Sequence, residues 1–175
     1  MIEVKNLSKS FGDKGVLSDI NFSIPKGQAV TIIGKSGVGK SVLLKCLIGL
    51  LKPDLGTVYI DNKLINSMNF KQLQEIRSKI GMVFQFGALF DSLNVSDNIS
   101  LALKKLTLLN TDEIRVRVKD SLEEVGMENT EQLMPSELSG GMKKRIGIAR
   151  AIALKPSFLF YDEPTTGLDP VMTDV

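Results

Sequence analysis

A glycine-rich stretch with a lysine and a serine at its end could bind the phosphates of a nucleotide. It matches GxxxxGK[ST] and consists of Gly34, Lys35, Ser36, Gly37, Val38, Gly39, Lys40 and Ser41. Glycines let backbone N–H groups point at phosphate oxygens, and a helix that starts there adds its positive end. Lys40 is expected to reach the outer phosphates and Ser41 a magnesium ion. An ordinary glycine-rich turn is the alternative, but a strand-like run before the motif and a helix-like stretch after it favour a phosphate loop.

Two adjacent carboxylates, Asp162 and Glu163, end the apolar run 158–161. Ligands collect at the carboxyl ends of parallel strands, and successive side chains of a strand point to opposite sides. Magnesium takes one or two carboxylates together with phosphate oxygens, so Asp162 is expected to bind it with Ser41. Glu163 is expected to act on the water that attacks the phosphate. The alternative is a strand end capped by acids.

A second glycine pair follows Ser139 and opens a second predicted helix, from Gly140 and Gly141 to about residue 154. Three cations at residues 143–145 oppose the macrodipole of this helix near its start. An anionic partner would remove that conflict. Tolerated surface lysines are the alternative, because long side chains reach water easily.

Composition indicates one globular domain with a real core: 175 residues, 43% apolar and 24% charged. The net charge is +2, and positive and negative residues are interspersed, so the sequence shows no basic cluster of the kind that binds nucleic acid. Cys46 is the only cysteine, which excludes an internal disulfide and favours core packing. No run has the apolar length of a membrane span, so any membrane role requires a partner.

Strand-like and helix-like segments alternate, which predicts an α/β fold with a mainly parallel sheet. Helical periodicity dominates from about residue 94 to 154, with Thr111 as an expected N-cap. Turn residues at 53–56 and at 61–62 predict a small antiparallel hairpin. The expected strands lie near residues 2–7, 21–24, 29–33, 57–60, 80–84 and 158–161.

Together, in this order, the motifs resemble those of the nucleotide-binding subunit of ATP-binding-cassette (ABC) transporters. The resemblance covers essentially all of the chain. It implies a P-loop NTPase (RecA-like) core with a small antiparallel β subdomain and a helical ABC subdomain. We expect a single, incomplete nucleotide-binding domain over residues 1–175, with the core at 1–85 and 155–175 and the helical subdomain at about 86–154.

The resemblance also implies roles for further residues. Phe11 would stack on adenine, Gln85 would be the Q-loop residue that serves magnesium and catalysis, and residues 167–169 would form the D-loop with Asp169. Each has a simpler alternative. Phe11 could pack in the core, Gln85 could be a polar residue at a strand edge, and Asp169 could cap a helix before Pro170.

In this family two subunits pair head to tail, so each ATP lies between one phosphate loop and the other subunit's signature loop at Ser139, Gly140 and Gly141. The catalytic residues implied are Glu163, Lys40, Gln85 and Ser139, and the cofactors are ATP and Mg²⁺. The expected partners are a second copy of the subunit and integral membrane permease subunits. The expected location is the cytoplasmic face of the inner membrane, as a peripheral protein.

Residues 84–99 and 138–145, with Met142 where the signature more often has glutamine, resemble the ATPase of Mla/Mce-type lipid transporters. This implies phospholipid or other hydrophobic cargo, with a permease docking at residues 86–93. Buried helical core is the alternative for the aromatic residues of this patch, and another cargo is the alternative for the function. An ABC ATPase of DNA repair or translation is disfavoured, since the chain has neither a tandem cassette nor a long coiled-coil insertion.

The sequence contains no histidine, whereas this family has a switch histidine on a strand after the Glu163 position. The chain ends at Val175, twelve residues after Glu163, so we expect it to be truncated at its carboxyl end. Two function classes remain: a transport ATPase, or a nucleotide-binding fragment that does not hydrolyse ATP by itself.

Overall fold

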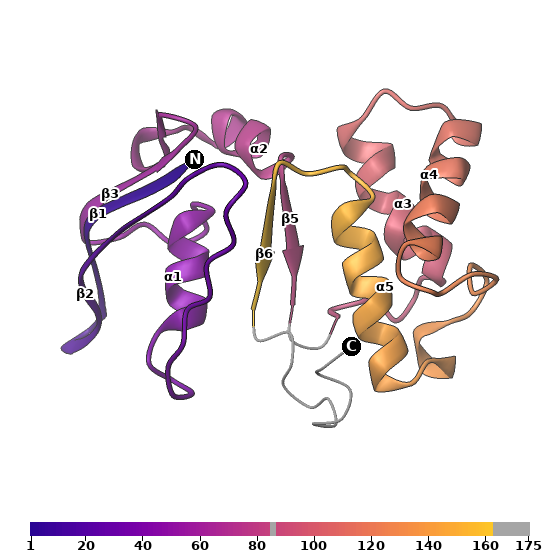
Figure 1. The fold of residues 1–175 in the computed structure, drawn as a ribbon, viewed down its shortest axis with the longest axis horizontal. Helices are drawn as coiled ribbons and strands as arrows, with labels where there is room; N and C mark the ends of the chain where they lie inside the picture. Colours follow the sequence, from indigo (N-terminus) through magenta and orange to yellow (C-terminus); the bar gives the residue numbers. More distant parts are fainter. Residues whose placement is uncertain (85–86, 163–175) are drawn as a thin grey trace. The chain divides into compact units, whose positions relative to one another are not determined.

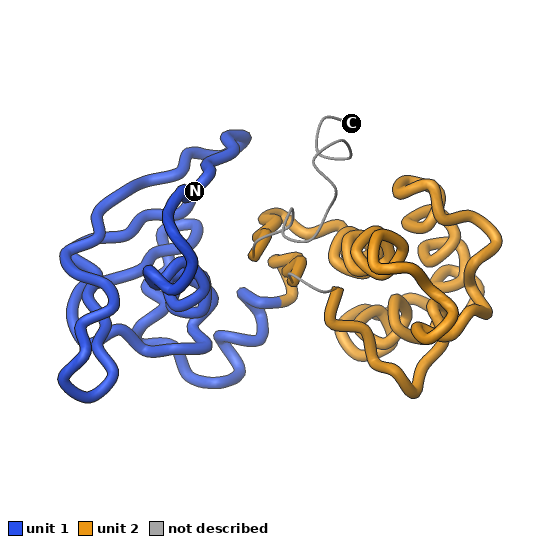
Figure 2. The backbone as a smooth tube through the Cα atoms, turned by 90° about the horizontal axis from the view of Figure 1, so that it is seen from below, with its two compact units in different colours: residues 1–77 blue, residues 78–175 orange. Residues whose placement is uncertain are grey.

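The computed structural model describes residues 1–84 and 87–162. The chain divides into two compact units, residues 1–77 and 78–175, which are coloured separately in Figure 2. Gln85, Glu163 and the expected D-loop with Asp169 lie outside the described residues. The sequence-based division into a core and a helical subdomain stays a prediction.

The first unit is built on a four-stranded antiparallel sheet. Its order is β2-β1-β3-β4, from β1 (Ile2–Phe11), β2 (Lys14–Ile24), β3 (Leu55–Ile60) and β4 (Lys63–Leu64). Asp61 and Asn62 turn β3 into β4 with positive φ angles of 47° and 62°, which is the turn that suits a tight hairpin. The predicted antiparallel hairpin is therefore confirmed.

Three helical segments complete the first unit: α1 (Lys40–Leu47), a 3₁₀ turn (Ile65–Ser67) and α2 (Phe70–Arg77). Helix α1 lies next to the sheet in Figure 1. Cys46 on this helix is 1% exposed, so its predicted core packing is confirmed. Burial raises the pKa of the Cys46 thiol. The buried apolar residues of the sheet and of α1 include Val4, Leu7, Leu17, Leu43, Leu47, Val58 and Ile60.

One predicted strand is absent from the sheets of the described residues. Residues 29–33 form neither helix nor strand, and Ile33 is 92% exposed. The run is apolar enough for a buried parallel strand. A strand, however, also needs a neighbouring strand with which its backbone N–H and C=O groups form hydrogen bonds. The four-stranded sheet of the first unit does not include this run, whose apolar side chains are exposed.

The second unit contains two parallel strands and a helical cluster. Strands β5 (Ile80–Val83) and β6 (Phe158–Tyr161) pair in parallel, and β6 has the bounds predicted. The helices are α3 (Val95–Leu106), α4 (Thr111–Glu123), a 3₁₀ turn (Pro135–Glu137) and α5 (Gly140–Ile152). Figure 1 shows α3, α4 and α5 packed together, with α5 nearest to β5.

The helical cluster has its own apolar core, in which Ile99, Leu103, Leu122, Ile146 and Ala149 are fully buried. Helix α5 also approaches β5 closely, since a Cβ added at Gly81 would lie 2.7 Å from the carbonyl oxygen of Ala151. This packing holds the carboxyl-terminal end of α5 against β5.

The expected N-cap of α4 is wrong by one residue. Asn110 caps the helix: its side chain accepts from the N–H of Glu113 at 3.0 Å, and Glu113 accepts from the N–H of Asn110 at 2.7 Å. Thr111 is instead the first helical residue. A capping box needs an acid three residues after the cap, and Glu113 has that spacing from Asn110.

Candidate functional site

The phosphate loop of the first unit depends on two glycines in left-handed conformation. Gly37 has φ 81° and Gly39 has φ 105°. A Cβ at Gly39 would lie 2.9 Å from Cγ1 of Val16 and 3.2 Å from the Val16 carbonyl oxygen, so the loop is pressed against β2. Only glycine combines this conformation with this contact.

Lys40 turns back into the loop. Its Nζ donates to the carbonyl oxygen of Gly34 at 2.8 Å and to that of Lys35 at 3.0 Å. The ammonium group therefore lies inside the curve of the backbone that precedes it. This places a fixed positive charge where the sequence motif predicts the outer phosphates of a nucleotide.

Helix α1 starts at Lys40 without a side-chain cap at Gly39 and without an acidic residue in its first turn. The first turn of α1 therefore contains no carboxylate of its own that would offset the positive end of the helix dipole. An anion is the natural complement of such a helix start. Ser41, the residue predicted to bind magnesium, is the second residue of α1 and is half-buried. The loop thus fits a polyphosphate.

Phe11 ends β1, and its ring is 49% exposed. This rules out the alternative of core packing and leaves the ring available for stacking. The ring centroid lies 5.5 Å from Nζ of Lys9, which also donates to Oδ1 of Asp54 at 2.7 Å. Oδ2 of Asp54 accepts from the N–H of Ser10 at 2.7 Å. The hydrogen bonds from Lys9 and Ser10 lower the pKa of Asp54.

In the second unit, Asp162 directly follows β6. Its N–H donates to the carbonyl oxygen of Val83 at 2.9 Å, and Val83 pairs with Tyr161 at the last position of the parallel ladder. The carboxyl ends of β5 and β6 therefore lie at the same edge of the two-stranded parallel sheet. Gln85 and Glu163 come next in the sequence and are not among the described residues.

No group of three or more His, Cys, Asp or Glu residues that could hold a metal occurs in residues 1–84 and 87–162. A magnesium ion would therefore need oxygen ligands from outside such a cluster, for example those of a bound nucleotide, and the predicted roles of Ser41 and Asp162 stay predictions. Mg²⁺ in nucleotide sites is typically bound in this way.

The second glycine-rich helix start is confirmed. Ser139 is the N-cap of α5, and its Oγ accepts from the N–H of Met142 at 3.2 Å. A Cβ at Gly140 would meet nothing within 4 Å, and one at Gly141 only Oγ of Ser139 at 4.0 Å. Packing among residues 1–84 and 87–162 does not require either glycine, and within these residues both leave the helix start open. Helix α5 ends at Ile152, slightly before the predicted residue 154.

The sequence analysis assigned no role to two structurally important residues, Asn98 and Arg150. Asn98 is 1% exposed on α3, between the buried Val95 and Ile99, and its amide bonds the loop before the helix. Arg150 on α5 donates to two carbonyl oxygens of residues 87 and 88. An amide on an otherwise apolar helix face was the available signal for Asn98.

A phosphate loop, an acid at the end of a parallel strand and a second glycine-rich helix start define a nucleotide-binding α/β protein. The family described as ABC transporter matches residues 17–166. The chain therefore belongs to the ABC transporter family, and its fold is a P-loop NTPase fold with an antiparallel β portion and a helical portion.

Two relatives and one solved structure illustrate the similarity. The chain is 47% identical over 172 residues to the "Probable ribonucleotide transport ATP-binding protein mkl" of Mycobacterium leprae, which covers 98% of the chain and 50% of the relative. It is 42% identical over 175 residues to the "Intermembrane phospholipid transport system ATP-binding protein MlaF" of Haemophilus influenzae, covering 100% of the chain and 66% of the relative. The chain thus spans about half to two thirds of the length of these relatives.

The solved structure is the dimeric post-hydrolysis state of the ATP-binding cassette MJ0796 bound to ADP and Pi. The chain matches it with a TM-score of 0.90 at 35% identity, covering 99% of the chain and 78% of that protein. The match in both sequence and structure agrees with the predicted fold class.

Proposed function

We propose that this chain is the ATP-binding and ATP-hydrolysing part of an ABC transporter subunit. The observation that carries the proposal is the phosphate loop, in which Lys40 donates to Gly34 and Lys35 at the uncapped start of α1. Family membership and the similarity to a cassette solved with ADP and Pi support it.

In this proposal Lys40 exchanges its two loop carbonyls for phosphate oxygens when ATP binds. The N–H groups at the start of α1 bind the remaining phosphate oxygens, and Phe11 stacks on the adenine. Ser41, Gln85 and Asp162 would hold Mg²⁺, which supplies charge neutralisation at the phosphates. The fixed donors of the loop stabilise charge that develops on the γ-phosphate.

Glu163 is proposed to orient or deprotonate the water that attacks the γ-phosphorus. The oxygen of water forms a bond to this phosphorus while the bond to the bridging oxygen of ADP breaks, and inorganic phosphate leaves. Ser139, Gly140 and Gly141 are proposed to act on ATP held by a second copy of the subunit. Their open helix start, free of internal packing demands, supports contact with a partner.

We propose lipid, and phospholipid in particular, as the cargo. The resemblance of residues 84–99 and 138–145 to Mla/Mce-type ATPases supports this, as does the similarity to MlaF. The name of the mycobacterial relative favours a second candidate, a small polar solute such as a ribonucleotide. No helix of the described residues has the length and apolarity needed to cross a membrane. The proposed location is the cytoplasmic membrane face, through a permease.

The proposed permease-docking patch is residues 86–93. Within its described part the ring of Phe90 is 52% exposed, whereas Leu89 is packed against the helical core. An exposed aromatic ring on a well-ordered base is a common anchor in protein interfaces. The alternative of buried core therefore does not hold for Phe90, and Phe86 lies outside the described residues.

Mg²⁺-dependent ATP hydrolysis by the purified protein over a concentration series tests the activity, with Glu163→Gln as control and ATP binding measured in parallel. Turnover that rises more than linearly with protein and is lost in Glu163→Gln is the expected result. Saturable ATP binding without turnover would instead leave a nucleotide-binding fragment.

Transfer of labelled phospholipid between vesicles by the complex with its permease tests the cargo. ATP-dependent transfer is expected, with Glu163→Gln as the inactive control. Transfer of a ribonucleotide in place of phospholipid would overturn the lipid assignment while leaving the ATPase proposal intact.

A further inference from the structure

The segment Gly87–Ala88, which begins two residues after the expected Q-loop residue Gln85 in the sequence, has an unusual backbone. Gly87 has φ 74° and Ala88 has φ 47°, so two successive residues are left-handed, one of them with a Cβ. Single non-glycine residues in this region are strained and persist only where the surroundings hold them. The contacts that hold this pair therefore matter.

Arg150 of α5 holds both residues at once. Its Nη1 donates to the carbonyl oxygen of Ala88 at 2.8 Å, and its Nη2 donates to that of Gly87 at 2.7 Å. A guanidinium group is planar and rigid enough to bind two acceptors in a fixed geometry, which a lysine does not reproduce. Burial lowers the pKa of the Arg150 guanidinium, which remains charged at neutral pH.

The same segment is pressed against the backbone of α5. A Cβ at Gly147 would lie 2.9 Å from Cα of Gly87, and a Cβ at Gly87 would lie 2.5 Å from the carbonyl oxygen of Lys143. Two glycines thus let the segment and the helix touch through their main chains. Such a contact transmits a displacement without the slack of long side chains.

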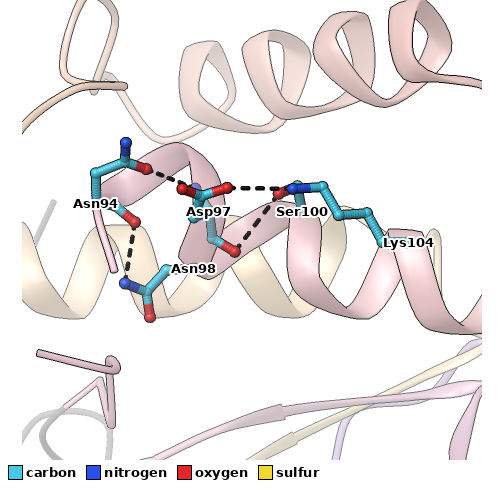
Figure 3. A network of polar contacts seen from close by, with 5 residues as sticks. All are labelled: Asn94, Asp97, Asn98, Ser100 and Lys104. Carbon is cyan, nitrogen blue, oxygen red and sulfur yellow. Dashed lines mark hydrogen bonds and ion pairs between the residues drawn. The ribbon is translucent and has the colours of Figure 1, made fainter. Parts of the chain in front are cut away.

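The next residues are held from α3. Asn98 accepts from the N–H of Phe90 at 2.7 Å and donates to the carbonyl oxygens of Phe90 and Leu93 at 3.1 and 2.9 Å. Figure 3 shows Asn98 beside Asn94, whose side chain caps α3 through the N–H of Asp97. The exposed ring of Phe90 therefore projects from a main chain that is fixed on both sides.

We propose that Arg150 is a positioning residue that couples the docking segment at residues 87–90 to the Ser139 end of α5. The proposal rests on the proposed function, since it takes Phe90 as a permease contact. Arg150 lies eleven residues after Ser139, about 16 Å along one continuous helix. A displacement of Phe90 by the permease displaces Gly87 and Ala88. Their hydrogen bonds with Arg150 then displace helix α5, which carries Gly140 and Gly141 at its start.

The test compares Arg150→Lys with Arg145→Lys in the full-length protein, alone and assembled with its permease in vesicles. Arg145 is a matched control because it lies on the same helix and donates to one carbonyl oxygen, that of Gly126 at 3.2 Å, away from the docking segment. Basal ATPase kcat and KM of the isolated Arg150→Lys subunit are expected to stay within about twofold of the parent. Stimulation by the permease is expected to fall about tenfold, a loss of about 1.4 kcal/mol of coupling.

Gly147→Ala is the second variant, because its methyl group displaces Gly87 without changing the guanidinium. The same selective loss of stimulation is expected, with thermal unfolding confirming the fold. Equal losses of basal and stimulated activity, or equal behaviour of Arg150→Lys and Arg145→Lys, would overturn the role of Arg150 alone. A parent protein without ATPase activity or without permease stimulation would overturn the proposed function, and the coupling role with it.

Discussion

The two glycine-rich helix starts of this chain differ in why they need glycine. In the phosphate loop, Gly37 and Gly39 are left-handed, and Gly39 has no room for a Cβ beside Val16. At the start of α5, neither Gly140 nor Gly141 has a positive φ, and neither has a close neighbour among the described residues. The first pair is required by the fold, and the second pair is not.

This difference separates a site that the chain builds for itself from a surface that it presents. The phosphate loop is shaped by its own backbone and already encloses the ammonium group of Lys40. The α5 start is capped by Ser139 and otherwise bare. We propose that a ligand of the first is held by one chain and that a ligand of the second arrives with a partner. The following predictions test this contrast.

The largest expected effect is that of Gly39→Ala. Left-handed strain and the contact with Val16 together are expected to lower the free energy of unfolding by about 2–5 kcal/mol and to abolish ATP binding. Gly37→Ala is the control, because it has the same handedness but nothing within 4 Å, and it is expected to cost about 1–2 kcal/mol. Urea unfolding and nucleotide titration measure both. Equal costs for the two variants would contradict the role of the Val16 contact.

Gly140→Ala is expected to show the opposite pattern. Alanine fits the helical backbone there and meets nothing within 4 Å, so the free energy of unfolding should be unchanged or higher by up to about 1 kcal/mol. A methyl group on a surface that a partner's nucleotide must approach should lower ATPase kcat on the order of tenfold. ATP binding by the separate subunit should be unaffected. A large loss of stability would break the comparison.

Ser139 allows the cap and the partner role to be separated. Ser139→Ala removes the bond to the N–H of Met142 and should cost about 1 kcal/mol of stability. Ser139→Asp keeps a good N-cap, so stability should stay within about 0.5 kcal/mol, but its charge repels an approaching phosphate and should lower kcat. Thermal unfolding and ATPase assays measure the two properties. Full activity in Ser139→Asp would argue against phosphate contact at this position.

Local signals in the sequence predicted the elements that depend on local chemistry. Strand β6 was predicted with its observed bounds because an apolar run ends at charged residues, and the hairpin at Asp61 and Asn62 followed from turn residues that tolerate positive φ. The phosphate loop and the glycine-rich start of α5 were predicted for the same reason, since each motif prescribes its own backbone.

Features that depend on distant partners were missed. Residues 29–33 have the composition of a strand, yet strand formation depends on which neighbour is available for pairing, and composition does not encode that. The contact of Arg150 with Gly87 and Ala88 joins residues more than 60 positions apart in the sequence. Nothing local to α5 distinguishes Arg150 from the exposed Arg145, which explains why the sequence motifs did not single it out.

The smallest expected effect concerns Asp54, which lies near Phe11, the residue proposed to stack on adenine. It binds Lys9 and the N–H of Ser10 next to Phe11, and these hydrogen bonds lower its pKa. The pKa of Asp54 is lower in the folded than in the unfolded state, so its contribution to stability is present above the ordinary aspartate pKa and is lost as pH falls through the lowered one. Because Asp54 is exposed and solvent screens its charge, Asp54→Asn should weaken ATP binding only about twofold at neutral pH. The ATP affinities of the variant and its parent should converge as the pH falls. Activity that depends on Ser139 should not change. A difference in ATP affinity that stays constant down to the lowest pH would show that Asp54 acts through something other than its charge.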